Sequence, residues 1–278
     1  MVGVSSLAHG SVRLLFCTML CGAVSALPVK VEAADLASYK ALYNVETSFS
    51  RTGSRVSDVQ GKVYYEIKKS CEGWISNIKS TLDYAYANAD PEEIETRSTS
   101  FEKFDGKTLN FSSVRRVDGE IDQETRGIAT LTADGSGSAR FSVPDNKTIS
   151  LSKGTLFSQE QTAQLIKAAQ QGQKIYNAIL FDSADSSGPV EVNAVIGKKI
   201  VSHKDAKLTS DLVEGSGWIV REAIFRQDSE QQGMNDYEMT LELLENGVVK
   251  NLTADYRNFS MTQKLVAIEP INEECGAE

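Results

Sequence analysis

The sequence contains very little histidine. Only His9 and His203 occur among 278 residues, and His203 lies in the polar stretch Ser202-His203-Lys204-Asp205. Imidazole titrates near neutral pH and is the commonest protein ligand of metals, so its scarcity argues against general-base catalysis and histidine-rich metal sites. We therefore predict a non-enzymatic protein with no catalytic, cofactor-binding or metal-binding residues. A hydrolase ranks third among the functional hypotheses.

Other patterns that carry chemistry are also missing. The stretches Gly135-Ser136-Gly137-Ser138 and Gly215-Ser216-Gly217-Trp218 lack the spacing of a serine nucleophile elbow. Gly197-Lys198-Lys199 lacks the preceding glycine of a phosphate-binding loop. The sequence therefore gives no motif for a nucleophile or a nucleotide site.

No segment is long and apolar enough to cross a bilayer as a helix. The apolar stretch 14–24 follows Arg13, the only charged residue among the first 26, and small residues follow it. This order is typical of a signal peptide cleaved after Ala26, with Ala33 or Ala34 as alternative cleavage points. We predict that 1–26 is removed and that 27–278 is a single exported domain that does not span the membrane.

Positive charge is in the minority. The chain has 29 lysines and arginines against 38 aspartates and glutamates, a net charge of −9, and no long basic cluster. Such a surface repels nucleic acid and anionic lipid surfaces. We therefore predict that the protein has no nucleic-acid partner.

Cysteine is scarce in the predicted mature chain. Cys17 and Cys21 lie within the signal peptide, which leaves Cys71 and Cys275. In an oxidising compartment, two thiols without neighbouring metal-ligand or catalytic patterns are expected to pair. We predict a disulfide between Cys71 and Cys275.

Alternation of apolar and polar residues dominates the rest of the sequence. One apolar face and one wet face are typical of antiparallel strands around a core. Four Asp-Gly or Asn-Gly pairs, beginning at residues 105, 118, 134 and 246, are typical of tight hairpins between such strands. The predicted inward faces hold Tyr39, Ala41, Tyr43, Val45, Thr47 and Phe49, then Trp74, Ile78, Leu82, Tyr84 and Tyr86, then Ile219, Ala223 and Phe225, then Tyr237, Met239, Leu241 and Leu243, and finally Val248, Leu252, Ala254 and Tyr256.

One helix longer than two turns is predicted, over 159–171. Ser158 is its expected cap, Gln161 completes a capping box, and Gly172 ends it. Segments 182–188 and 215–217 are expected to be loops, and neither is long enough to separate domains. The sequence therefore predicts an all-β fold of at least ten long antiparallel strands, forming one domain with a single main helix. A helix that plugs the curved sheet and one that packs against its end remain equal alternatives.

An ordered set of short motifs resembles the alphaproteobacterial periplasmic β-spiral family of cell-envelope integrity proteins (EipB type). The set covers almost the whole mature chain. It consists of Tyr39-Lys40-Ala41-Leu42-Tyr43, Gly61, Tyr65-Glu66, Cys71-Glu72-Gly73-Trp74, Phe104-Asp105-Gly106, Gly127-Ile128-Ala129, Gly154-Thr155-Leu156-Phe157, Phe181-Asp182, Gly188-Pro189-Val190, Tyr237-Glu238, Glu245-Asn246-Gly247-Val248, Asp255-Tyr256, Phe259 and Cys275.

The resemblance implies a barrel-like open β-spiral that encloses one α-helix. It also implies a role in outer-membrane homeostasis and stress resistance, with no established catalysis. The chain departs from the family at Ser152, Ser158 and Gln161, where the family tends to carry proline or, shortly after the Gly-Thr-Leu-Phe motif, histidine. A role that depends on that histidine is not expected here.

Two functional hypotheses follow from these expectations. The first is a non-enzymatic protein that maintains the envelope by binding another envelope component, which is a protein, peptidoglycan or lipid. The alternative is a carrier of lipid or lipoprotein with an apolar groove on the concave face. A carrier requires an apolar cavity, whereas a scaffold can have a filled core.

Overall fold

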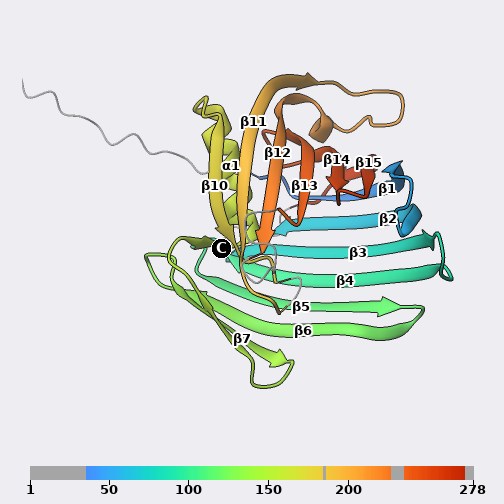
Figure 1. The fold of residues 1–278 in the computed structure, drawn as a ribbon. Coiled ribbons are helices and arrows are strands. Elements are labelled where there is room, and N and C mark those ends of the chain that lie inside the picture. The colour runs from blue at the N-terminus through green and yellow to red at the C-terminus, as the bar shows by residue number, and fades with distance from the viewer. Residues whose placement is uncertain (1–35, 184–185, 227–234, 273–278) are drawn as a thin grey trace, which may run out of the picture. The chain divides into compact units, whose positions relative to one another are not determined.

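The computed structural model describes residues 36–183, 186–226 and 235–272, and all of its elements belong to the unit Ala33–Glu278. These residues form fifteen strands, one α-helix and one short 3₁₀-helix. Figure 1 shows how the labelled elements are arranged. The first eight strands are β1 (Tyr39–Ser50), β2 (Val56–Lys69), β3 (Gly73–Tyr86), β4 (Glu92–Lys103), β5 (Thr108–Val117), β6 (Glu120–Leu131), β7 (Gly137–Val143) and β8 (Thr148–Leu151). The rest are β9 (Thr155–Leu156), α1 (Ser158–Gln170), β10 (Ile175–Leu180), β11 (Val190–Ser202), η1 (Asp211–Val213), β12 (Gly215–Arg226), β13 (Tyr237–Leu244), β14 (Val249–Asp255) and β15 (Phe259–Pro270).

The strands form a single sheet in which sequence neighbours pair. The order is β8-β7-β6-β5-β4-β3-β2-β1-β15-β14-β13-β12-β11-β10-β9. All pairs are antiparallel except β9 with β10. The two end strands, β8 and β9, are separated by only three residues of chain, so the sheet curls back on itself almost to closure. The predicted barrel-like antiparallel fold with one main helix is confirmed.

The hairpin prediction is confirmed at all four dipeptides. They join β4 to β5, β5 to β6, β6 to β7 and β13 to β14. At Asp118-Gly119 both residues have positive φ, 50° and 85°, as a type I′ turn requires. Each turn therefore links strands that are adjacent in the sheet.

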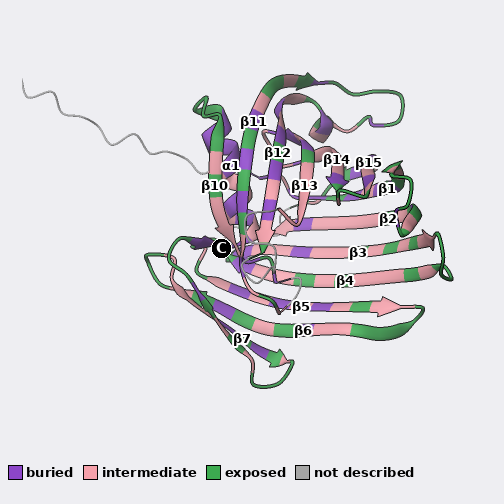
Figure 2. Cartoon of the chain, viewed as in Figure 1, coloured by how far each residue is buried: buried purple, intermediate pink, exposed green. Residues whose placement is uncertain are grey.

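Alternation correctly predicts the inward face of most strands, and Figure 2 shows buried residues interrupting exposed ones along them. On β1, Tyr39, Tyr43 and Val45 are buried, but Phe49 is 52% exposed. A register irregularity between Thr47 and Phe49 explains this error, because one extra residue turns the following side chains to the other face.

The inward face of β12 was predicted wrongly. The buried side chains are Trp218, Val220, Glu222 and Ile224, whereas Ile219, Ala223 and Phe225 lie on the other face. The buried Glu222 interrupts the apolar pattern of the true inner face. The alternation in the sequence therefore assigns the inner face to Ile219, Ala223 and Phe225 instead.

The loop expected at 215–217 is also wrong, because β12 begins at Gly215. A Cβ atom at Gly217 would lie 2.5 Å from the Leu243 carbonyl oxygen. Glycine here lets β12 and β13 approach closely, so this glycine belongs to a strand rather than a loop.

Helix α1 connects β9 to β10 and packs against the inner face of the sheet. Its Leu165 and Ile166 belong to one core cluster with Trp218 and Val220 of β12. The predicted range agrees within one residue at each end, and Gly172 follows the last turn. The helix is thus enclosed by the sheet, as the plug hypothesis proposed.

Candidate functional site

A cavity of about 460 Å³ lies between α1 and the inner face of the sheet. Its size falls within the roughly 300–1,000 Å³ typical of small-molecule sites. Most of its lining is aliphatic or aromatic. The aliphatic members include Leu36, Val63, Ile67, Ile78, Leu82, Leu165, Leu241, Val249 and Leu252.

Strand periodicity places these side chains in the cavity. On β3, Ile78, Ser80 and Leu82 occupy alternate positions and all three line it. On β2, Val63, Tyr65 and Ile67 do the same. Period-two side-chain placement therefore turns three neighbouring strands, β1 to β3, into one apolar wall.

Three tyrosines provide hydroxyl groups along this wall. The rings of Tyr39 and Tyr65 lie 5.7 Å apart, and the Tyr43 hydroxyl donates to the Val249 carbonyl at 2.9 Å. Burial raises the pKa of Tyr39, Tyr43 and Tyr65 above the ordinary value of 10.0. These phenols are therefore neutral at physiological pH.

One ionisable carboxyl group lines the cavity. Glu222 on β12 projects inward and is only 6% exposed, and its hydrogen-bond partner is the Gln161 side chain of α1. Burial raises the pKa of Glu222 to about 7, although the bond from Gln161 opposes the shift. The cavity therefore contains one weak acid that titrates near neutral pH.

A second buried glutamate fixes the start of the helix. The carboxylate of Glu102 on β4 accepts the backbone N–H of Gln159 and that of Glu160, each at 2.9 Å. Burial raises the pKa of Glu102 to about 7, and the two N–H bonds oppose this rise. Glu102 satisfies helix donors that would otherwise be unpaired.

The predicted capping role of Ser158 is therefore wrong. Phe157 occupies the N-cap position without a side-chain cap, and Ser158 is the first helical residue. The group that caps the helix instead is the Glu102 carboxylate. Local sequence could not identify it, because Glu102 lies on a strand 57 residues earlier in the chain.

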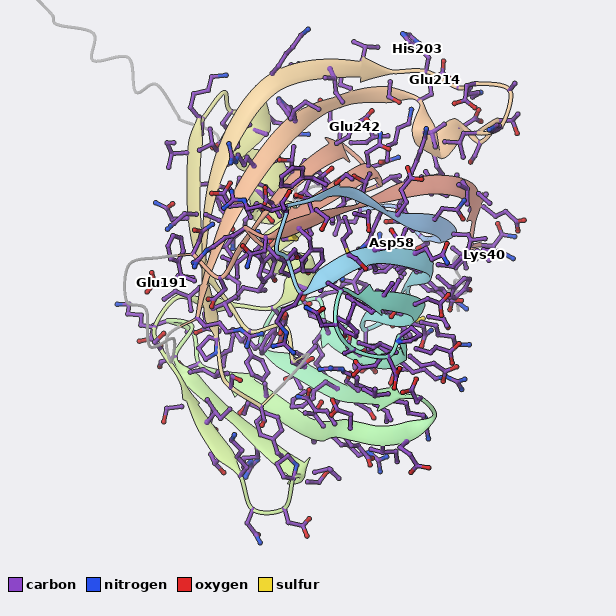
Figure 3. All side chains as sticks on the ribbon, turned by 45° about the vertical axis from the view of Figure 1, so that its right-hand side comes forward. Lys40, Asp58, Glu191, His203, Glu214 and Glu242 are labelled. Atoms are coloured by element: carbon purple, nitrogen blue, oxygen red, sulfur yellow. The ribbon has the colours of Figure 1, made fainter. Side chains whose placement is uncertain are left out.

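The other residues singled out from the sequence do not gather at one site. Gln161 lines the cavity, Ser152 is exposed, and His203 is exposed at the end of β11, where Figure 3 shows its side chain projecting outward. Cys71 is exposed in the turn between β2 and β3, and Cys275 lies outside the described residues, as does the predicted signal peptide 1–26.

No group of three or more histidines, cysteines, aspartates or glutamates is arranged to hold a metal ion in the part of the chain that the structure describes. Within the same residues, no helix is long and apolar enough to cross a membrane.

Comparison with known proteins gives one consistent result. The family model described as EipB-like matches residues 30–272. A curated relative, "Cell envelope integrity protein EipB" of Brucella abortus (strain 2308), is 33% identical over 251 residues, which are 89% of this chain and 88% of the relative. The crystal structure of a beta-barrel-like protein, a domain of unknown function (DUF1849) from Brucella abortus, matches with a TM-score of 0.80 and 30% identity, covering 86% of this chain and all of that chain.

Proposed function

Because this chain belongs to the EipB-like family, we propose that it maintains cell-envelope integrity by binding the acyl chain of an envelope component in its interior cavity. The observation that carries the proposal is the apolar cavity between α1 and the sheet. It favours the carrier hypothesis over a scaffold with a filled core.

The lining of the cavity matches the chemistry of an acyl chain. Aliphatic side chains such as Ile78 and Leu252 offer contacts without hydrogen bonds, and burying a methylene group contributes about 0.8 kcal/mol. The polar groups of the lining include Glu222 on β12 and Gln161 on α1, which pair with each other. An apolar chain can therefore lie along the β1–β3 wall without leaving that pair unsatisfied.

We further propose that the protein works in the periplasm. The order of charge, apolar stretch and small residues within 1–26 supports cleavage and export. The relative's name refers to the cell envelope, which is compatible with that compartment.

We propose no catalytic step. His203 is exposed, and Glu102 is engaged with two backbone N–H groups of α1. Glu222 then remains as a buried acid on the cavity wall, hydrogen-bonded to the Gln161 side chain. These observations support a binding protein.

Mass spectrometry of the lipid extract tests this proposal. The protein would be purified from the periplasm without detergent and extracted with organic solvent. We expect a species with an acyl chain at a stoichiometry near one per protein, which the extracted protein takes up again. An extract without such a species, together with no uptake of added lipid, would contradict it.

A further inference from the structure

The inner face of the sheet is mainly apolar on β1 to β3 and carries a row of polar side chains on β4 to β6. By strand register Ser80 on β3 faces Thr96 on β4, Thr96 faces Arg115 on β5, and Arg115 faces Gln123 on β6. Because Ser80 lines the cavity, period-two placement puts all four residues on the inner face. Figure 1 shows β3 to β6 lying side by side.

A second polar row lies next to the first. It begins at Ile78 of the cavity wall and continues through Ser98, Ser113 and Thr125. The Ser98 and Ser113 hydroxyl oxygens lie 2.7 Å apart. The residues Ser80, Thr96, Ser98, Ser113, Arg115 and Gln123 thus form a polar field that borders the apolar cavity.

Hydrogen-bond donors in this field are not all used. Among the residues that the structure describes, the Ser80 and Thr96 hydroxyls have no hydrogen-bond partner, and both side chains are half-buried. Polar groups held on a concave inner face without protein partners are available to water or to a ligand.

Arg115 supplies the cation of the polar field. Its side chain is 44% exposed, and its Nε lies 3.4 Å from Oδ2 of Asp122. An ion pair that is this exposed to solvent is weak. A guanidinium has five N–H donors, so most of the donors of Arg115 have no partner among the described residues.

Two tyrosines lie beside this guanidinium. Burial raises the pKa of Tyr84 and Tyr86, and Arg115 opposes both shifts, which places its charge near both phenols. The two rings stack with centroids 6.3 Å apart, and the Tyr86 hydroxyl donates to Glu92. Glu92 Oε2 thus accepts the Tyr86 hydroxyl, while the Asp122 carboxylate is the ion-pair partner of Arg115.

We propose that the polar field binds a phosphate-bearing head of the same amphiphile whose acyl chain occupies the cavity, an inference that rests on the proposed function. A phosphate offers several acceptor oxygens and matches a guanidinium bidentately, with hydroxyl donors completing its shell. The apolar wall and the polar field meet at Ile78 and Ser80, so one ligand can contact both.

Two amphiphiles that differ only in the phosphate test the head site. The probes are 1-myristoyl lysophosphatidic acid and 1-myristoylglycerol, titrated calorimetrically below their critical micelle concentrations into delipidated, full mature protein. We expect the phosphate-bearing probe to bind about tenfold more tightly, as a charge-assisted hydrogen bond implies.

Variants at two adjacent residues locate the effect. Arg115→Gln should abolish the preference for the phosphate without changing binding of 1-myristoylglycerol, and Arg115→Lys should retain part of it. Arg116→Gln is the matched control, because Arg116 is next to Arg115 in β5 and therefore lies on the opposite face of that strand, opposite Glu95 in the register. Circular dichroism would establish that each variant is folded.

The outcomes separate the two proposals. Equal affinity of the unchanged protein for both probes, or the same loss in Arg115→Gln and Arg116→Gln, would overturn the head site while leaving the cavity proposal intact. Absence of binding by both probes would overturn the cavity proposal and the head site with it.

Discussion

The carboxylate of Glu102 lies 2.9 Å from the backbone nitrogen of Gln159, joining the end of β4 to the first turn of the only α-helix in the described residues. The helix dipole favours a negative group at this end, and the two N–H bonds give the carboxylate the partners that its burial requires. Since Gln159 and Gln161 line the cavity, this contact also positions part of the proposed binding site.

Replacing this cap should destabilise the fold. Glu102→Ala leaves the Gln159 and Glu160 N–H groups buried without partners, and we expect a loss of about 2 kcal/mol in the free energy of unfolding. Urea denaturation of the purified mature protein measures it. Glu93→Ala, an exposed position on the same strand, is the control, and equal stability of the two variants would contradict the capping role.

Glu222 should make stability depend on pH. Its pKa is about 7 in the fold and near 4.5 when exposed, so the folded state keeps a proton that the unfolded chain releases. The contribution is fully present below pH 4.5 and is lost as pH rises through 7, about 3 kcal/mol in all.

Urea denaturation at pH 5 and pH 8 tests this dependence. Glu222→Gln should reduce the difference in stability between the two pH values, leaving the part that Glu102 contributes. Glu191→Gln, on the exposed face of β11, should change nothing. A Glu222→Gln variant with the full pH dependence of the unchanged protein would rule out this carboxyl group as the source.

Cys71 and Cys275 are predicted to form one disulfide. The loop of about 200 residues that it closes gives roughly 5 kcal/mol of stabilisation in the chain-entropy model. Cys71→Ser, Cys275→Ser and the double variant should therefore lose equal stability. Thiol titration of the unfolded, unreduced mature protein should find no free thiol, and two per chain would disprove the pairing.

Export is predicted to be necessary for function. Deleting the gene should sensitise cells to detergents and cell-wall antibiotics, and the full-length gene should restore resistance. A copy that lacks 1–26 should fail, because its product would stay in the cytoplasm. Full restoration by that truncated copy, at equal protein level, would show that the site of action is not the periplasm.

The sequence predicts the fold well because the inward residues obey a local rule. Tyr39, Ala41 and Tyr43 alternate with polar neighbours, and Asp118-Gly119 marks its own turn. Each of these signals depends on a few adjacent residues, so neither requires knowledge of the tertiary contacts.

The site was predicted less completely because its polar residues depend on distant contacts. Glu222 is an acidic residue on an inner face, and its hydrogen-bond partner Gln161 comes from another element, α1. Arg115 joins Thr96 and Ser80 only through strand register. No local pattern distinguishes such residues from the other charged residues of the chain.

Uptake of a fluorescent fatty acid by delipidated protein tests the central claim most directly. Ile78→Trp places an indole ring in the cavity in place of a smaller aliphatic side chain, whereas Lys79→Trp places the same ring on the opposite face of β3. We predict saturable uptake near one molecule per protein, at least about tenfold weaker in Ile78→Trp and unchanged in Lys79→Trp. Equal uptake by the two folded variants, or no uptake by the unchanged protein, would contradict an acyl chain in this cavity.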